Sequence, residues 1–335
     1  MDETAGDDRD DPRHDLVRVF RRLCVVAGTA ATLPVLASLV LRQVAVASPR
    51  LVAYVAATPA IVVAGVAAVV VLLIGGSHTG TAVAAVATVL LGLTQVPLYL
   101  GSAGRPAEDA GTFTIMTVNL HFGVGDLRQV LEVADARDVD VLATEELPLF
   151  GVRAMLDAGP SELFPHRITN GLRGASGNAL WSRRPLSELP VPGGIEHAPL
   201  AASVDVGGTH LFVACVHPVS PYPDGAHQWS AEMGRLADWL AGVEGAAVVA
   251  GDFNATSDHR QFRDILAAGL EDAAMQVGAG WLPTFPANRR RIPLLVTIDH
   301  VLASDGIVAT DVERVDIAGT DHAALVVRLA VPAVV

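Results

Sequence analysis

The chain has 335 residues, enough for one or two domains, and 51% of them are hydrophobic, with a mean hydropathy of +0.43. These values are too high for an ordinary soluble protein and indicate segments that lie in a membrane. The formal net charge of −13 argues against DNA as the main substrate, because tight binding of a long polyanion normally needs a basic face.

The first 100 residues predict a membrane anchor. Residues 1–22 form an acidic tail, with seven Asp or Glu among the first 15 positions. Three blocks without a charged residue follow at 23–41, 51–74 and 81–100, and each is long enough to cross roughly 30 Å of hydrocarbon as a helix. We therefore predict three transmembrane helices. An alternative for 23–41 is a secretory signal peptide, although the apolar core of such a peptide is normally shorter.

The distribution of arginine predicts the orientation of these helices. Five arginines precede the first apolar block, and two lie in the loop that follows it. The positive-inside rule then places the N-terminus in the cytoplasm. Three crossings put residues 101–335 on the other side. The hypothesis is a multi-pass protein of the cell membrane with an extracytoplasmic C-terminal domain.

After a linker at 101–111, residues 112–331 have the pattern of an α/β domain. Asp126 can cap a helix whose apolar positions repeat at helical spacing. A second helix is predicted at 227–243, with Trp229 and Leu236 on its apolar face. Seven segments are predicted as strands: 112–121, 140–146, 178–183, 210–217, 246–253, 296–303 and 322–330.

Polar residues gather at the ends of these predicted strands, where α/β sheets usually place their sites. One such residue would be unremarkable, but the pattern repeats from the first strand to the last. The residues are Asn119, His121, Glu145, Glu146, His217, Asp252, Asn254, Asp299, His300, Asp321 and His322.

These residue types suit the hydrolysis of a phosphate ester. Several carboxylates and an amide are oxygen ligands that favour Mg²⁺ or Mn²⁺, and no set of Cys or multiple His ligands indicates structural zinc. An Asp–His pair can act as an oriented general base toward water. A second His and an Asn can donate hydrogen bonds to a phosphate as negative charge builds on it.

The motifs TVNLH, ATEEL, HP, GDFNATSD, TIDHVL and TDHAALVV, in this order, resemble the endonuclease/exonuclease/phosphatase superfamily. It includes deoxyribonuclease I-like nucleases, inositol polyphosphate 5-phosphatases and neutral sphingomyelinases. The resemblance covers about 112–331. It implies a four-layer α/β sandwich with two packed mixed sheets, here preceded by three transmembrane helices.

The resemblance also implies a role for each matching residue. His322 is the expected general base and Asp299 its partner, while His217 is expected to contact the phosphate. Asp252 and Asn254 match the pair that orients the water and the phosphate. The expected metal-binding residues are Glu146, Asn119 and Asp321.

Three further groups of residues lie in less specific motifs, so their roles are predicted with alternatives. Glu145 stands where the family usually has Gln, which would add an acid near the metal. His121 and His300 are expected to pack or to support the site. Arg289, Arg290 and Arg291 are either a solvated loop or a clamp for phosphate.

The arrangement of three spans and such a domain is similar to a bacterial membrane subfamily linked to teicoplanin-type antibiotic resistance and lipid-carrier recycling. That likeness implies a lipid-linked phosphate as the substrate, such as undecaprenyl diphosphate in the cell envelope. A sphingomyelinase-like phosphodiesterase or a surface endonuclease is the alternative. A membrane scaffold without catalysis is a third hypothesis, which the intact set of His and carboxylate residues disfavours.

Overall fold

The computed structural model describes residues 12–159, 162–170, 177–288 and 296–333. The chain divides into two compact units, which are described separately. Unit 1 comprises Met1–Gln43 and Ala57–Gln95, and unit 2 comprises Val44–Ala56 and Val96–Val335.

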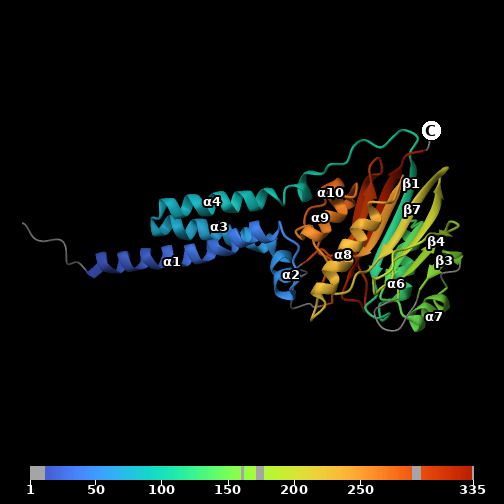
Figure 1. Ribbon diagram of the computed structural model, residues 1–335, viewed down its shortest axis with the longest axis horizontal. Helices are drawn as coiled ribbons and strands as arrows, with labels where there is room; N and C mark the ends of the chain where they lie inside the picture. Colours follow the sequence, from blue (N-terminus) through green and yellow to red (C-terminus); the bar gives the residue numbers. More distant parts are fainter. Residues whose placement is uncertain (1–11, 160–161, 171–176, 289–295, 334–335) are drawn as a thin grey trace, which may run out of the picture. The chain divides into compact units, whose positions relative to one another are not determined.

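Unit 1 is built from packed apolar helices. Glycines lie where the helices touch: a Cβ at Gly28 would be 2.5 Å from Leu72, and one at Gly65 would be 2.5 Å from Thr88. Small residues let helix backbones approach closely, as in membrane helix pairs. The helices are α1 (Pro12–Leu41), α3 (Thr58–Gly75) and α4 (His78–Leu93) (Figure 1).

Two helices in the described residues, Arg13–Leu41 and Thr58–Gly75, are long and apolar enough to cross a membrane. The third predicted span is represented by α4, which is apolar but has only 16 residues. Large apolar side chains cover the helix surfaces, and those of Leu23 and Val63 are 62% and 70% exposed. Length and composition therefore support two spans, and the predicted count of three is not confirmed.

Prolines explain why the helices differ from the predicted blocks 51–74 and 81–100. Pro59 lies in the first turn of α3, and Pro97 in the first turn of α5 (Pro97–Leu100). A proline has no N–H to donate to the carbonyl four residues earlier, and its ring clashes with that carbonyl, so it is tolerated in the first turn of a helix and each apolar run is divided there. Residues 49–56 consequently form a separate helix, α2 (Pro49–Ala56), which belongs to unit 2.

Unit 2 contains two six-stranded sheets, and each is mixed. In the first sheet β1 and β2 are parallel, and in the second β7 and β8 are parallel, while the other pairs are antiparallel. The first sheet has the order β11 (Val308–Asp316), β12 (Ala323–Val331), β1 (Gly111–Asn119), β2 (Val141–Glu145), β4 (Ala179–Ser182), β3 (His166–Thr169). The second has the order β5 (Ser187–Glu188), β6 (Leu200–Val206), β7 (Thr209–Val216), β8 (Ala247–Asp252), β10 (Asp299–Ser304), β9 (Leu270–Asp272).

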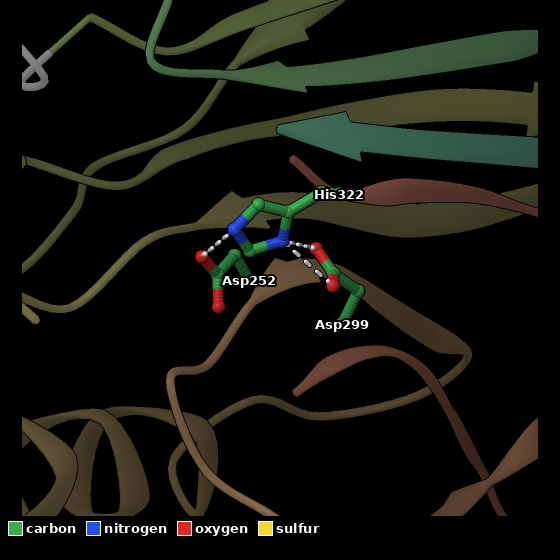
Figure 2. Close-up of side chains that lie close together, drawn as sticks. All are labelled: Asp252, Asp299 and His322. Carbon is green, nitrogen blue, oxygen red and sulfur yellow. Dashed lines mark hydrogen bonds and ion pairs between the residues drawn. The ribbon is translucent and has the colours of Figure 1, made fainter. Parts of the chain in front are cut away.

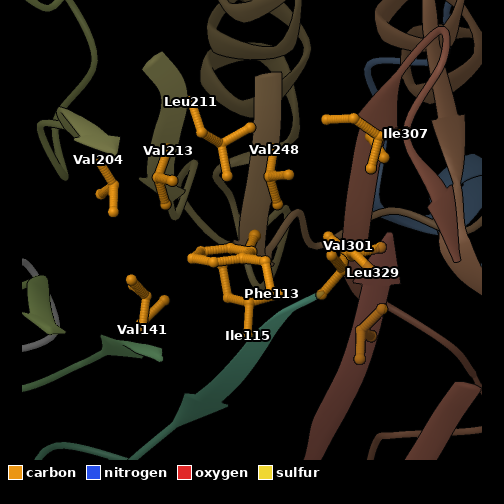
Figure 3. Close-up of a cluster of buried hydrophobic side chains, with 14 of the residues drawn as sticks. Phe113, Ile115, Val141, Val204, Leu211, Val213, Val248, Val301, Ile307 and Leu329 are labelled. Carbon is orange, nitrogen blue, oxygen red and sulfur yellow. The ribbon is translucent and has the colours of Figure 1, made fainter. Parts of the chain in front are cut away.

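The main core lies between the two sheets (Figure 3). Phe113 and Ile115 of β1 belong to the same fully buried cluster as Val213 of β7 and Val248 of β8. Burial of this apolar surface is the dominant force that holds the sheets face to face. The structure thus confirms the predicted α/β fold with two packed mixed sheets.

Helices cover the outer faces of both sheets. A second buried cluster joins the first sheet to α6 (Leu127–Ala136) and α7 (Leu149–Asp157). On the second sheet, Phe212 of β7 meets Trp239 of α8 with ring centroids 5.7 Å apart. The remaining helices are α8 (Ala226–Leu240), α9 (Arg260–Leu266) and α10 (Ala273–Val277).

The predicted helix signals are confirmed. The Asp126 carboxylate accepts hydrogen bonds from the backbone amides of Arg128 and Gln129, so it caps α6. Trp229 and Leu236 of α8 are fully buried, as the apolar periodicity predicts. All seven predicted strands are also present, as β1, β2, β4, β7, β8, β10 and β12.

Candidate active site

Strand register brings the polar strand ends to one edge of the molecule. Asn119 at the end of β1 lies opposite Glu145 at the end of parallel β2. In the second sheet Asp299, which begins β10, lies opposite Asp252, which ends β8. Antiparallel β12 begins beside the end of β1, directly after His322. The same edge therefore receives residues that are far apart in the sequence.

A His–Asp pair forms one side of the site (Figure 2). His322 Nδ1 lies 2.9 Å from Asp299 Oδ2 and 3.1 Å from Asp299 Oδ1. Because Nδ1 donates to this buried carboxylate, the other nitrogen, Nε2, points into the site, 3.7 Å from Asp252 Oδ2. This geometry gives an oriented imidazole with one nitrogen available for proton transfer.

Asn119 joins the two halves of the site. Its Nδ2 donates to Glu146 Oε1 at 3.1 Å and to Asp252 Oδ2 at 3.0 Å. His217 Nε2 lies on the same side, 3.7 Å from Asp252 Oδ2 and 4.0 Å from Glu146 Oε1. The structure thus brings three carboxylates, an amide and two imidazoles together.

The backbone is strained at the positions that carry these groups. Glu146 and Asn254 both have φ of 50°, and His121 and Phe122 have φ of 46° and 57°. Left-handed backbone is uncommon for residues with a side chain and persists where other contacts impose it. Here the Phe122 backbone amide donates to Glu146 Oε2 at 2.9 Å. This bond holds in place the carboxylate that the strained backbone of Glu146 carries.

Asn254 links the two loops at the edge of the second sheet. Its backbone N–H donates to Asp252 Oδ1 at 2.8 Å, and its side-chain Nδ2 donates to the Pro218 carbonyl at 3.1 Å. Pro218 follows His217, so Asn254 holds the His217 loop against the end of β8. In this geometry Asn254 positions both Asp252 and His217.

Buried carboxylates determine the charge of His322. Burial alone lowers its pKa, but Asp299 and Asp252 outweigh burial and raise the pKa of His322 to about 10. Burial raises the pKa of Asp252, although the neighbouring His322 opposes that rise. His322 is therefore an imidazolium at neutral pH while only carboxylates face it. A cation close to these carboxylates would favour the neutral imidazole that a general base requires.

The donor set of the site fits a hard divalent cation. Asp252, Asp299 and His322 offer ligand atoms that lie within 4.8 Å of one another. Both Asp299 oxygens, however, already contact His322 Nδ1. Glu146 Oε1, which shares the Asn119 amide with Asp252, is a further oxygen that could hold a cation. Oxygen ligands of this kind suit Mg²⁺ or Mn²⁺.

The other predicted metal ligands have defined partners. Asn119 Oδ1 accepts from the His121 amide at 2.9 Å, so Asn119 turns its nitrogen toward the two carboxylates. Asp321 Oδ1 lies 2.9 Å from His121 Nδ1 at the exposed margin of the site. Metal binding by Asn119 and by Asp321 stays a prediction. Arg289, Arg290 and Arg291 lie outside the described residues.

His300 supports the fold beside the site. Its Nδ1 lies 2.6 Å from Asp272 Oδ2, and its Nε2 lies 2.9 Å from the Ala255 carbonyl. Although burial lowers the pKa of His300, the Asp272 charge and hydrogen bond outweigh burial and raise it. His300 thus ties β10 to β9 and to the loop after β8, and neither of its ring nitrogens bonds to the His322–Asp299 pair.

Thr320 is a site residue that the motifs did not reveal. Its hydroxyl donates to the Asn119 carbonyl at 2.7 Å and accepts from the His322 amide at 3.1 Å. Thr320 therefore fixes His322 to the end of β1. In the sequence, only its position directly before Asp321 and His322 could have indicated this role. A threonine in a loop is not specific for an active site, because its hydroxyl often bonds to nearby backbone.

Glu145 is a buried carboxyl group whose surroundings disfavour its negative charge. It is fully buried, and Oε1 accepts from Thr117 Oγ1 at 2.9 Å and lies 3.3 Å from Cys215 Sγ. Burial, with Asp299 adding to it, raises the pKa of Glu145 to about 8. The expectation of an additional acid near the metal stays a prediction, and the raised pKa favours a protonated carboxyl group, which resembles the neutral amide of Gln.

Glu145→Gln tests this protonation. The folded pKa of about 8 exceeds the usual value of 4.5, so folding takes up a proton between these pH values. Wild-type stability should fall as pH rises from 4.5 to 8 and level off above, by up to about 5 kcal/mol. Glu145→Gln lacks that loss and should keep near-normal turnover. The melting-temperature difference between variant and wild type should grow from pH 5 to pH 8.

The exposed Glu188 provides the matched control. Glu188→Gln should change the melting temperature equally little at every pH. A constant difference between Glu145→Gln and wild type across this range would mean that Glu145 is ionised in the folded protein.

Comparison with known proteins agrees with the geometry. Residues 116–322 match the model of the Endonuclease/Exonuclease/phosphatase family. The chain belongs to this family. The resemblance seen in the strand-end motifs is thereby confirmed, whereas the membrane-anchored subfamily stays a prediction. No curated protein matches the chain.

Solved structures share the fold of unit 2. An endonuclease/exonuclease/phosphatase from Beutenbergia cavernae superposes with a TM-score of 0.53 at 22% identity, covering 66% of this chain and 72% of that chain. Humanized D. rerio TDP2 gives 0.54 at 14% identity, with 65% and 98% covered. An AP endonuclease from Archaeoglobus fulgidus gives 0.54 at 18% identity, with 64% and 98% covered. At these identities the likeness shows the fold alone.

Proposed function

We propose that this protein is a membrane-anchored, divalent-metal-dependent phosphoesterase that hydrolyses a membrane-borne phosphate or diphosphate ester. The observation that carries the proposal is the buried His322–Asp299 pair, whose free Nε2 faces Asp252. The family supports a hydrolase of phosphate esters, and two apolar helices support membrane association. The lead substrate is undecaprenyl diphosphate or a related lipid phosphate of the cell envelope.

The site residues divide the reaction between them. His322 Nε2 accepts a proton from water as the water oxygen bonds to phosphorus, and the Asp299 carboxylate stabilises the imidazolium that forms. His217 lies where it can donate to a phosphoryl oxygen, while Asn119 donates to Glu146 and Asp252 and holds both carboxylates in the site. The bond from phosphorus to the leaving oxygen breaks, and that oxygen keeps the electron pair. A divalent cation held by Glu146 and Asp252 would supply positive charge to the phosphate.

The substrate proposal rests on charge as well as on the anchor. The net charge of −13 opposes the approach of a long polyanion, while a single phosphate group at a membrane needs only the local site. A lipid phosphate brings its phosphate to the place where an anchored enzyme already lies. The antibiotic-resistance role of the similar subfamily would follow if the lipid is a carrier of cell-wall precursors.

A panel of substrates tests the proposal. Detergent-solubilised full-length protein with Mg²⁺ should release phosphate from undecaprenyl diphosphate faster than it cleaves phospholipids or plasmid DNA. The alternative is a phosphodiesterase, and the shared fold with an AP endonuclease is the observation that favours it. Preferred cleavage of sphingomyelin or DNA would replace the lead substrate with this alternative. Absence of hydrolysis on every substrate would favour a scaffold.

Chain connectivity supports a topology with three crossings. Residues 44–56 and 96–333 belong to one compact unit, which supports a topology with both on the same side of a membrane. The segment between them must then cross an even number of times, and if α3 crosses, α4 must cross back. The 16 residues of α4 extend about 24 Å, which is short but manageable through local thinning of the bilayer.

A reporter fused after Val335 tests the orientation. The arginine excess before α1 places the N-terminus inside, so three crossings make the fusion point extracytoplasmic. Alkaline phosphatase fused there should be active. A second fusion at Ser77, in the turn between α3 and α4, should be inactive and serves as the control. The reverse result would contradict both the topology and an extracytoplasmic lipid substrate.

A further inference from the structure

The segment Val44–Ala56 connects α1 to α3, yet it is a part of unit 2. Three side chains of the hydrolase domain donate hydrogen bonds to its backbone carbonyls. Gln261 Nε2 donates to Val46 at 2.7 Å, and Tyr222 Oη donates to Pro49 at 2.7 Å. A loop between two candidate membrane helices is thus built into the domain that carries the active site.

The third donor is His259, and its tautomer is fixed by its partners. The Thr256 amide donates to His259 Nδ1 at 2.9 Å, so Nδ1 is an acceptor. His259 Nε2 therefore carries the proton and donates to the Val52 carbonyl at 3.1 Å. The ring is only 1% exposed and packs edge-on against Trp229. Each nitrogen has a specific partner, one in the 44–56 segment and one beside the site.

The Thr256 partner belongs to the catalytic turn, which we define as residues 252–256. Asp252 and the strained Asn254 begin this turn, and Trp229 Nε1 donates to the Phe253 carbonyl at 3.2 Å. His259 closes the other end of the turn. A displacement of Val52 is therefore transmitted through one rigid imidazole to the loop that positions Asp252.

The segment also reaches the His217 side of the site. Tyr222, which binds the Pro49 carbonyl, lies in the loop that follows His217. The Pro218 carbonyl of that loop accepts from Asn254. Both loops that border the second sheet thus contact the 44–56 segment, and they are joined to each other by Asn254.

We propose that the Val44–Ala56 segment is a positioning element of the active site, and that His259 is the residue that couples it to the catalytic turn. The membrane region then does more than tether the domain, because the loop between α1 and α3 completes the support of Asp252 and Asn254. This inference rests on the proposed phosphoesterase function of the same site.

Two substitutions separate the two hydrogen bonds of His259. His259→Asn places an acceptor near Nδ1 but cannot reach Val52, and Asn is favoured at the N-cap of α9, which His259 occupies. His259→Gln places a donor near Nε2 but removes the acceptor for Thr256. Coupling requires both bonds, so each variant should lower kcat about 10- to 100-fold with little change in KM.

The experiment uses full-length protein in detergent with Mg²⁺, and both bis(p-nitrophenyl) phosphate and undecaprenyl diphosphate as probes. Hydrogen exchange of the peptide spanning 252–258 gives a readout that does not depend on turnover. Loss of one hydrogen bond should make this peptide exchange roughly fivefold faster in each variant. Melting temperatures are measured for every protein.

Arg137→Met is the matched control, because Arg137 binds Glu313 and contacts neither the 44–56 segment nor the catalytic turn. It should lower the melting temperature while kcat and exchange at 252–258 stay unchanged. Unchanged kcat and exchange in His259→Asn would overturn the inference, as would equal losses of kcat in Arg137→Met. If the wild type hydrolyses no phosphate ester, the proposed function fails, whereas the exchange result still decides the coupling.

Discussion

Replacing His322 with Ala should lower kcat by at least ~10²-fold, the usual size of a general-base contribution. The reason is geometric: His322 Nε2 is the nitrogen that faces the site, and Asp299 fixes the tautomer from the opposite side. The lost interaction acts mainly in the transition state, so KM should change little. Steady-state kinetics on the best substrate of the panel measure both values.

Companion variants show whether His322 is the base. Asp299→Asn should lose less activity, since the imidazole remains and only its orientation and charge support suffer. His217→Ala removes a neighbour of Asp252 and Glu146 and should weaken phosphate stabilisation without removing the base. If His322→Ala retains near-normal turnover while His217→Ala or His300→Ala abolishes it, the base is a different histidine. The family and the fold would stand after such a result.

The site was predictable because of how strand ends behave. Asn119, Asp252, Asp299 and His322 each stand at a boundary between an apolar strand and a loop, and register brings those boundaries together. The run of apolar residues that marks a buried strand is a strong local signal, and it predicted seven strands. Polar residues at the ends of six of these strands then formed the candidate site.

The five strands that were missed have weak local signals. β5 has two residues and β9 has three, too few for a pattern. β11 lies at a sheet edge and carries charged residues such as Asp311 and Glu313, which disguise its alternation. These strands exist because a neighbouring strand offers unpaired backbone groups, which is a tertiary effect.

Three features of the site depend on contacts between distant residues and could not be derived from spacing. The raised pKa of Glu145 follows from complete burial and from the charge of Asp299. The strained φ of Glu146 follows from its bond to the Phe122 amide. The docking of residues 44–56 follows from three side-chain donors far away in the sequence. Hydropathy instead assigned residues 51–56 to a membrane span.

Glu146→Gln should reduce turnover by orders of magnitude and weaken the binding of Mg²⁺, while the fold stays intact. Gln has nearly the same shape but lacks the negative charge that a divalent cation requires, and its oxygen is a weaker ligand. The Phe122 amide can still donate to an oxygen at this position, so the strained backbone keeps its support. Calorimetric titration with Mg²⁺ and hydrolysis before and after EDTA measure the two effects.

The control for Glu146 must separate the loss of a ligand from a general change of charge. Glu188→Gln, on the exposed strand β5, removes the same charge far from the strand ends that form the site, and it should change neither Mg²⁺ affinity nor turnover.

Removing the cation should also restore the high pKa of His322, because the carboxylates of Asp299 and Asp252 then act on it uncompensated. EDTA would thus remove both the charge that binds phosphate and the neutral state of the base. Hydrolysis that persists unchanged in EDTA, or in Glu146→Gln, would contradict a metal-dependent mechanism and leave His322 to act with Asp299 alone.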